Sequence, residues 1–385
     1  MRRTIRAFAL SLCVMAFGDT SALAQQSDAV AAPQDCADSQ LCIGVRSYAR
    51  PFAYRPGNLN EVASDAPRGP LRAAGYTGYM VKICDAALAE MTLDTGNGKP
   101  LTKSDIGIFD IDLDREERHR RSGCALDPVA EDAICPVPVR RFTEGLGRQF
   151  DVLCDPATIS NDRRDNGYTI SPPLFLTGIA YLSQRGIDGP GDPCSNLYTE
   201  GLIGVVGGTN AGARGVRALV DFDELPKYRE ELIAYLRTRQ PCGEDSANGA
   251  SSPGNSGFRM IRSYNTHMDA AQAFCEKSVH YYLGDLEIIT ENVRSVPGCE
   301  YRVSPTTYTN DRYGVFGKSR RDDDGELDPQ ETRRALLVAQ FFQILAQKTV
   351  VNPSILDKAF SDTFQNANPS RKLELFLWSI RGAHE

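Results

Sequence analysis

Two short apolar segments each run directly into a turn that is rich in hydrogen-bond donors. Residues 150–153 precede Thr-Ile-Ser-Asn-Asp-Arg-Arg at 158–164, and residues 202–206 precede Gly-Gly-Thr-Asn at 207–210 and then a helix. Turns of this kind at strand ends and helix N-termini can bind anions. An arginine pair after a strand is more often a solvated surface turn, so the anion-binding interpretation depends on the surrounding sequence. Because apolar strands alternate with helical segments, we expect an α/β protein with two lobes.

The length and charge of the chain narrow the class of protein. Its 385 residues are enough for two domains, and its formal net charge of −7 argues against a nucleic-acid partner. A hydrophobic content of 41% is that of a globular protein. Beyond the first residues, no apolar stretch is long enough for a membrane helix. We therefore expect a soluble mature protein.

The first residues predict a cleaved signal peptide over residues 1–24. Three arginines precede an apolar run at 7–17, and residues 22–24 read Ala-Leu-Ala, which is a typical cleavage site. The apolar run is too short to span a bilayer. The sequence therefore predicts export, with the mature protein in the periplasm.

The cysteine count supports an oxidising compartment. Of 11 cysteines, Cys13 lies in the expected signal peptide, which leaves ten. An even number in an exported chain predicts disulfides. No Cys-x-x-Cys spacing occurs and only four histidines are present, so we expect no metal site and no cofactor. The hypothesised pairs are Cys36–Cys42, Cys84–Cys154 and Cys124–Cys135, with the last four cysteines (Cys194, Cys242, Cys275, Cys299) pairing among themselves.

Two further segments carry side chains suited to a pocket. The loop at 47–70 contains Tyr48 and Phe52, which either wall a pocket or pack locally. The apolar segment 278–285 ends in Asp285. This carboxylate is either delivered to a cleft by a buried strand or acts as the N-cap of the helix that follows.

Residues 93–139 are expected to be an insertion. Charge runs at 110–114 and 115–121 are interpreted as solvated faces. Further along, residues 322–328 have part of the spacing of a calcium-binding loop, but Arg320 occupies the first ligand position. We therefore interpret that segment as the start of a helix rather than a metal site.

Several segments, in this order, resemble the family 3 extracellular solute-binding proteins, the periplasmic amino-acid receptors of ABC transporters. The segments are 43–52, 75–84, 150–173 and 203–209, with a weaker continuation at 279–286 and 313–315. The resemblance implies an α/β, two-lobed periplasmic-binding-protein type 2 fold with a ligand cleft between the lobes. Lobe 1 is expected over 36–173 and 313–385, and lobe 2 over 177–308.

The resemblance also implies roles for individual residues. Arg163 would clamp the ligand carboxylate, with the hydroxyls of Thr158 and Thr209 beside it, and Asp285 would bind the ligand amino group. The segment after Arg163 is one residue longer than is usual in the family, so Arg164 is the alternative clamp. Some family members carry a disulfide at the positions of the expected Cys84–Cys154 pair.

The function implied is capture of an amino acid or similar small polar solute by lobe closure. The expected partners are the small-molecule ligand and the membrane subunits of an ABC transporter, and the protein is expected to be a monomer without enzymatic activity. One alternative is a dehydratase-like enzyme on the same scaffold, for which His280 and Asp285 are the candidate acid and base. The other is a non-transport accessory or sensory binding protein.

Overall fold

A computed structural model describes residues 36–56, 69–93, 99–112, 141–184, 201–207, 209–238, 259–320, 329–364 and 369–382. The expected signal peptide, the expected Cys124–Cys135 pair and the acidic segment 322–328 lie outside these ranges. Within the ranges, no helix combines the length and apolar character that crossing a membrane requires.

The first lobe is built on a mixed sheet with the strand order β6-β1-β7-β15-β8, and β9 pairs with β15 beside this path. β1 runs parallel to β6 and β7, and β15 runs antiparallel to β7, β8 and β9. β1 is buried at every residue because both faces of the sheet are covered. The bounds are β1 (Leu41–Val45), β6 (Ile106–Asp110), β7 (Val152–Thr158), β8 (Thr169–Ile170), β9 (Phe175–Thr177) and β15 (Asp311–Gly317).

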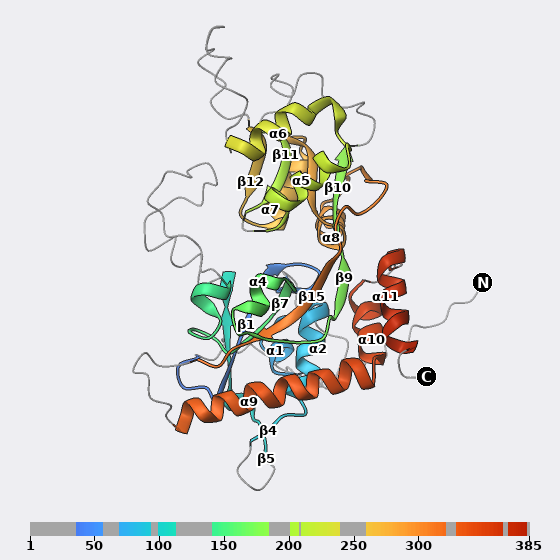
Figure 1. The fold of residues 1–385 in the computed structure, drawn as a ribbon. Helices are drawn as coiled ribbons and strands as arrows, with labels where there is room; N and C mark the ends of the chain where they lie inside the picture. Colours follow the sequence, from blue (N-terminus) through green and yellow to red (C-terminus); the bar gives the residue numbers. More distant parts are fainter. Residues whose placement is uncertain are drawn as a thin grey trace, which may run out of the picture.

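Helices from both ends of the chain cover one face of this sheet and share its main core. They are α1 (Pro70–Ala73), α2 (Tyr79–Leu88), α9 (Pro329–Ala346), α10 (Ser354–Thr363) and α11 (Arg371–Gly382). In Figure 1, α9 crosses the end of the lobe that lies away from the second lobe. The short helix η3 (Arg141–Gly145) belongs to the chain that covers the opposite face, where Phe142 packs against a smaller core.

The start of α2 shows how closely the chain is packed. Gly78, immediately before the helix, has φ +121, and a Cβ there would lie 2.4 Å from the carbonyl oxygen of Phe52. Only glycine is compatible with both constraints. Phe52 itself is fully buried, with its ring edge-on to those of Tyr79 and Phe175. Of the two interpretations of Phe52, local packing is therefore the one that the structure supports.

The second lobe contains a separate sheet with the order β12-β11-β13-β10-β14. β11 is parallel to β12 and β13, whereas β10 is antiparallel to β13 and β14. Its strands are β10 (Ile179–Gln184), β11 (Gly201–Val206), β12 (Arg259–Tyr264), β13 (Val279–Asp285) and β14 (Tyr301–Val303). Its main helices are α5 (Val216–Asp221), α6 (Arg229–Thr238), α7 (His267–Cys275) and α8 (Leu286–Arg294).

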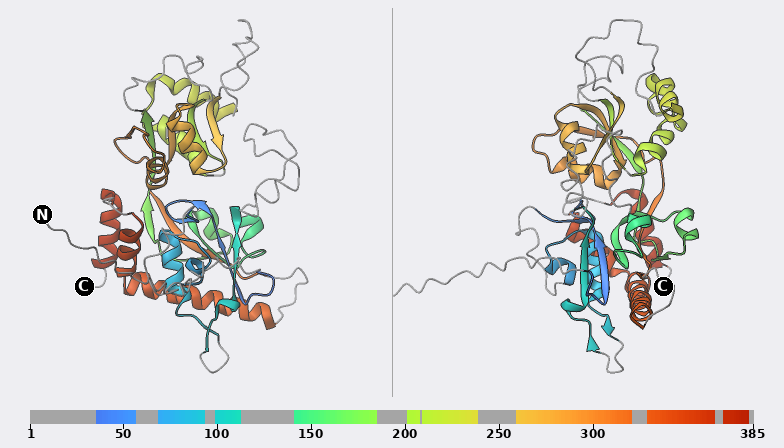
Figure 2. Two further views of the ribbon diagram at one scale, coloured as in Figure 1. Left: turned by 180° about the vertical axis from the view of Figure 1, so that it is seen from behind. Right: turned by 90° about the vertical axis from the view of Figure 1, so that its left-hand side faces the viewer.

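The lobes lie one above the other (Figures 1 and 2), joined where β9 and β15 pair. The chain passes up through β9 into β10 and returns through β15. Helix α8 also ties the lobes together, because its Ile288 is part of the first lobe's core. The Asn292 side-chain amide donates to the Arg50 carbonyl of the first lobe at 3.1 Å. The mixed α/β, two-lobed architecture expected from the sequence is thus confirmed.

Small elements complete the described chain. They are the strands β2 (Tyr48–Ala49), β3 (Ala53–Tyr54), β4 (Thr92–Leu93) and β5 (Lys99–Pro100), and the short helices η2 (Lys103–Asp105), α4 (Asn161–Asp165), η4 (Ala211–Gly215), η5 (Pro226–Tyr228) and η7 (Gln347–Val351). β2 and β3 form a hairpin at the Tyr48 loop.

Two expectations about residues 93–139 are wrong. The segment contains β6, which pairs along its whole length with β1, so it is not an insertion throughout. Asp110 and Asp112, expected on a solvated face, are buried. Both carboxylates accept hydrogen bonds from the loop after β1, including one from the Ser47 amide to Asp112 Oδ2 at 2.9 Å. The loop needs these acceptors because its own amides have left the sheet.

The disulfides within the described ranges agree with the hypothesised pairing. Cys36–Cys42 and Cys84–Cys154 are both formed. The latter joins α2 to β7 across the main core. Cys275 pairs with Cys299 in the second lobe, which is consistent with the last four cysteines pairing among themselves. Cys194 and Cys242 lie outside the described ranges.

Candidate functional site

The two donor-rich turns meet where the lobes face each other. Thr158 is the last residue of β7, and Asn210 follows β11 in the second lobe. The Asn210 side-chain amide donates to Thr158 Oγ1 at 3.1 Å. Thr209 instead donates its hydroxyl to the Val206 carbonyl at 2.7 Å, within its own turn. The side chain that reaches the first lobe is therefore Asn210, which the sequence did not single out.

Arg163 lies in α4, next to the end of β7. Its guanidinium donates to the Thr158 carbonyl oxygen and lies 4.0 Å from the centre of the Phe142 ring. No carboxylate among the described residues forms an ion pair with it. Burial, together with the neighbouring Arg141, lowers the pKa of Arg163 to about 10. This half-buried cation is therefore held by a carbonyl and an aromatic face, while the charges of Asp155 and Asp162 act on it without forming an ion pair.

The alternative clamp, Arg164, lies on a different surface. It is exposed and lines a cavity of about 300 Å³ with five residues of the chain that follows β7. The five residues are Ile159, Tyr168, Ile170, Ser171 and Pro173. The structure thus separates the two arginines: Arg163 turns toward Phe142, and Arg164 borders the cavity.

Buried ion pairs at the same end of the first lobe had not been anticipated. Arg46 Nε lies 3.3 Å from Asp112 Oδ1, and Arg141 donates to Asp155 Oδ2. Asp155 is fully buried, and its Oδ1 has no hydrogen-bond partner among the described residues. Burial raises the pKa of Asp155, although Arg141 and Arg46 oppose the shift. One feature of the sequence could have predicted this burial: Asp155 lies within an apolar strand, where a polar side chain is expected to be buried.

The charges of Arg46 and Arg141 also affect the pKa of His267 in the second lobe. It begins α7 and is buried, and its Nδ1 lies 2.9 Å from the Tyr282 hydroxyl. Burial lowers the pKa of His267 to about 3, and the charges of Arg46 and Arg141 add to the effect. It is therefore neutral near pH 7. His280, the candidate acid or base of the enzyme alternative, is also buried, and burial lowers its pKa to about 4.

Asp285 lies where β13 meets the connection between the lobes. Its Oδ2 accepts a hydrogen bond from the Tyr313 hydroxyl of β15, and its Oδ1 has no partner among the described residues. It occupies the N-cap position of α8 but makes no side-chain capping bond. Burial raises the pKa of Asp285 to about 7; Asp311 and Glu287 raise it further, and Tyr313 and Arg214 oppose them.

A short path of contacts through Tyr313 and Thr158 connects Asp285 with Arg163. Tyr313, which donates to Asp285, lies directly opposite Thr158 in the antiparallel pairing of β15 and β7. Residues opposite each other in such a pair share a face of the sheet. Thr158 in turn contacts Arg163 through its carbonyl and Asn210 through its hydroxyl. The first lobe thus carries a cation at one end of the path, and the second lobe an acid at the other.

The two remaining expected residues have different surroundings. Tyr48 is 37% exposed, and its backbone amide donates to Asp112 Oδ2 at 3.0 Å. Phe52 is in the core of the first lobe, where its ring centre lies 5.3 Å from that of Tyr313. Among the described residues, no group of three or more His, Cys, Asp and Glu side chains is arranged to hold a metal ion.

Known proteins resemble this chain in three-dimensional structure. No family model matches the sequence, and no curated protein matches it. An ancestral arginine-binding protein bound to glutamine matches with 14% identity and a TM-score of 0.43, over 84% of this chain and 97% of that one. An ancestral amino-acid-binding protein described as a precursor of cyclohexadienyl dehydratase matches with 14% identity and a TM-score of 0.45, over 84% of this chain and 95% of that one. The arginine-, lysine-, histidine-binding protein ArtJ from Geobacillus stearothermophilus matches with 16% identity and a TM-score of 0.44, over 87% of this chain and 99% of that one.

Proposed function

We propose that this protein is a periplasmic solute-binding protein that captures an amino acid, or a similar small zwitterion, between its two lobes. The observation that carries the proposal is the pair of incompletely satisfied charged groups at the two ends of the path through Thr158. Within the part of the chain that the structure describes, Arg163 has no carboxylate partner and one oxygen of Asp285 has no hydrogen bond. A zwitterion satisfies both ends at once.

The energetics favour a ligand that contacts both lobes. A hydrogen bond to a charged group contributes about 1.5–3 kcal/mol. Arg163 belongs to the first lobe and Asp285 to the second, so both sets of contacts form only when the lobes are close together. Ligand binding then stabilises the closed arrangement. In this proposal the ligand carboxylate takes the place of the direct Thr158–Asn210 hydrogen bond, with the Thr209 turn beside it.

The cellular part of the proposal follows from the sequence. Residues 1–24 direct export and are removed, and the mature protein acts as a monomer in the periplasm. It delivers its ligand to the membrane subunits of an ABC transporter. The site performs no chemistry, because its role is complete when the solute is bound and released.

A binding screen tests the proposal. The purified protein is screened by thermal shift against the common amino acids, and the affinity of any stabilising one is measured by calorimetry. We expect Arg163→Gln and Asp285→Asn each to weaken binding at least tenfold, which corresponds to loss of one charge-assisted contact. Arg148→Gln, which changes an exposed arginine of the same lobe, is the control and should leave affinity unchanged.

Two results would contradict the assignment. Unchanged affinity in both site variants would place the ligand elsewhere. Conversion of the bound compound, followed by chromatography of the ligand after incubation, would favour the dehydratase-like alternative instead.

A further inference from the structure

The C-terminal helix α11 is anchored in the first lobe and lies beside the connection between the lobes. Leu373 and Leu377, one turn apart on α11, are buried in the main core of the first lobe. In Figure 1 the helix stands beside β9, the strand through which the chain enters the second lobe, and the two elements are in contact. Polar side chains of α11 are therefore in a position to reach groups of the second lobe.

Lys372, in the first turn of α11, makes such a contact. Its ammonium group donates to Thr307 Oγ1 at 2.6 Å, to the Thr307 carbonyl at 3.3 Å and to the Thr309 carbonyl at 3.4 Å. The three acceptor oxygens come from one short segment, so a single cation holds that segment at two residues. Hydrogen bonds to a charged donor are stronger than those between neutral groups.

The segment held in this way, residues 304–309, belongs to the second lobe. The Ser304 amide donates to the Tyr181 carbonyl at 2.9 Å, and the Tyr308 amide donates to the Ile179 carbonyl at 2.8 Å, both in β10. Tyr308 is also part of a core cluster of the second lobe. The contact from α11 thus joins a helix of the first lobe to the edge of the second lobe's sheet.

The same segment leads directly into the hinge strand β15. Thr309 Oγ1 accepts from the Ile179 amide at 2.8 Å and donates to Asp311, the first residue of β15. Arg214 Nη1 of the second lobe lies 3.1 Å from Asp311 Oδ1. Because Lys372 is fixed to the first lobe and its acceptors to the second, a change in the angle between the lobes strains or breaks the ammonium contacts.

The local requirements of the helix do not explain a lysine at this position. Positive charges near a helix N-terminus are unfavourable, because the helix dipole is positive there. Arg371 has the same disadvantage but forms an ion pair at 3.1 Å with Glu374, one turn later in the same helix. The positions one turn after Lys372 hold Leu375 and Phe376, which offer no counter-charge. The contact with the second lobe accounts for the lysine.

A second contact across the lobes comes from the residue before α11. Burial raises the pKa of Glu287 in α8, and hydrogen bonds from the side chains of Thr177 and Ser370 oppose the shift. Thr177 ends β9, and Ser370 immediately precedes α11. The start of α11 therefore contacts the second lobe at two separate places, the segment 304–309 and helix α8.

We propose that α11 is a brace across the hinge, in which Lys372 clamps residues 307–309 and restrains opening of the lobes in the ligand-free protein. The inference goes beyond the proposed function, because it concerns the motion of the lobes and none of the residues proposed to contact the ligand. A restrained arrangement of the lobes also lowers the ordering cost of any ligand that contacts both of them.

Lys372→Met tests the brace in the full protein without ligand, because it removes the ammonium group and keeps a similar carbon chain. Small-angle X-ray scattering should give a larger radius of gyration and a broader distance distribution than for the unmodified protein. Hydrogen–deuterium exchange measured by mass spectrometry should be about tenfold faster over residues 304–311, a fold-change that corresponds to loss of one hydrogen bond to a charged group.

Arg371→Met is the matched control, because it removes the neighbouring positive charge of the same turn, whose partner lies within α11. It should leave both the scattering and the exchange unchanged. Thr307→Val removes only the hydroxyl acceptor and should change both measurements in the same direction as Lys372→Met, which keeps the test decisive if that variant does not fold.

Unchanged scattering and exchange in Lys372→Met and Thr307→Val, or an equal change in Arg371→Met, would overturn the brace. All of these measurements are made without ligand. Their outcome is therefore separate from the question of whether an amino acid binds between the lobes.

Discussion

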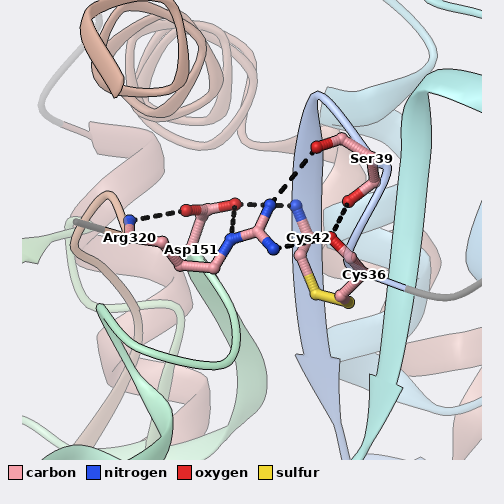
Figure 3. Close-up of a disulfide and its surroundings, with 5 residues drawn as sticks. All are labelled: Cys36, Ser39, Cys42, Asp151 and Arg320. Carbon is pink, nitrogen blue, oxygen red and sulfur yellow. Dashed lines mark hydrogen bonds and ion pairs between the residues drawn. A yellow bond between two sulfur atoms is a disulfide. The ribbon is translucent and has the colours of Figure 1, made fainter. Parts of the chain in front are cut away.

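Two buried carboxylates, one immediately before β7 and one within it, have very different surroundings. Asp151, immediately before β7, uses both oxygens: Oδ1 accepts from the Arg320 amide at 2.7 Å, and Oδ2 accepts from the Cys42 amide at 2.8 Å and from Arg320 Nε at 3.1 Å. The Arg320 guanidinium also donates to the carbonyls of Cys36 and Ser39. Figure 3 shows this group beside the Cys36–Cys42 disulfide. We call it the stapled end of the strand.

Asp155, four residues further along, belongs to the end that faces the second lobe. It pairs with Arg141 through one oxygen only, and the other oxygen is buried without a described partner. Proteins satisfy nearly all buried polar groups where structure alone is at stake. The difference indicates that the stapled end serves stability, whereas the interlobe end retains unsatisfied polar groups near the site proposed for the ligand.

The largest expected effect is at the stapled end. Asp151→Asn leaves the Arg320 guanidinium, whose side chain is 9% exposed, without its counter-charge. Breaking a buried pair in this way costs about 3–5 kcal/mol. Urea denaturation followed by circular dichroism should show that loss in the free energy of unfolding. Asp165→Asn, which changes an exposed aspartate of α4, is the control and should change it by less than about 0.5 kcal/mol. Equal losses of stability in Asp151→Asn and Asp165→Asn would mean that the stapled end has no special role in stability.

The stapled end also shows which features the sequence could and could not predict. Disulfides were predictable because the export signal and the even cysteine count can both be read from the sequence without knowing the fold. Arg320 was noted only because it occupied the first ligand position of a calcium-like segment. Its partner Asp151 is 169 positions away, and nothing in either neighbourhood identifies the pair.

The same limit applies at the interlobe end. The turns at Thr158 and Thr209 were predictable from strand-then-turn patterns, and they do face each other across the lobes. Burial of Asp110 and Asp112 was not, because a run of acids is usually solvated. Their burial depends on the loop after β1, whose amides need acceptors that only the folded chain brings near.

A medium effect is expected in the pH dependence of stability. The pKa of Asp285 is raised from 3.8 to about 7, so the folded state retains a proton that the unfolded chain releases. This contribution to stability is present below about pH 4 and is lost as the pH rises through about 7. The free energy of unfolding should therefore fall across this range by about 2 kcal/mol more in the unmodified protein than in Asp285→Asn. Parallel pH profiles for the two proteins, measured by urea denaturation, would contradict the assignment.

The smallest effect is expected at Asp155, which tests the comparison most directly. Burial raises the pKa of its carboxyl, so its charge is unfavourable in the folded state despite Arg141. Arg141 remains 20% exposed and also donates to the Pro156 carbonyl at 3.3 Å, so water and that carbonyl can still satisfy it. Asp155→Asn should therefore change the free energy of unfolding at pH 7 by less than about 1 kcal/mol, even though Asp151→Asn is the same chemical change immediately before the same strand. Because the contribution from a raised carboxyl pKa is lost as the pH rises, the stability difference between Asp155→Asn and the unmodified protein should shift in favour of the variant as the pH is raised. A loss as large as that of Asp151→Asn would mean that both ends of the strand are held in the same way.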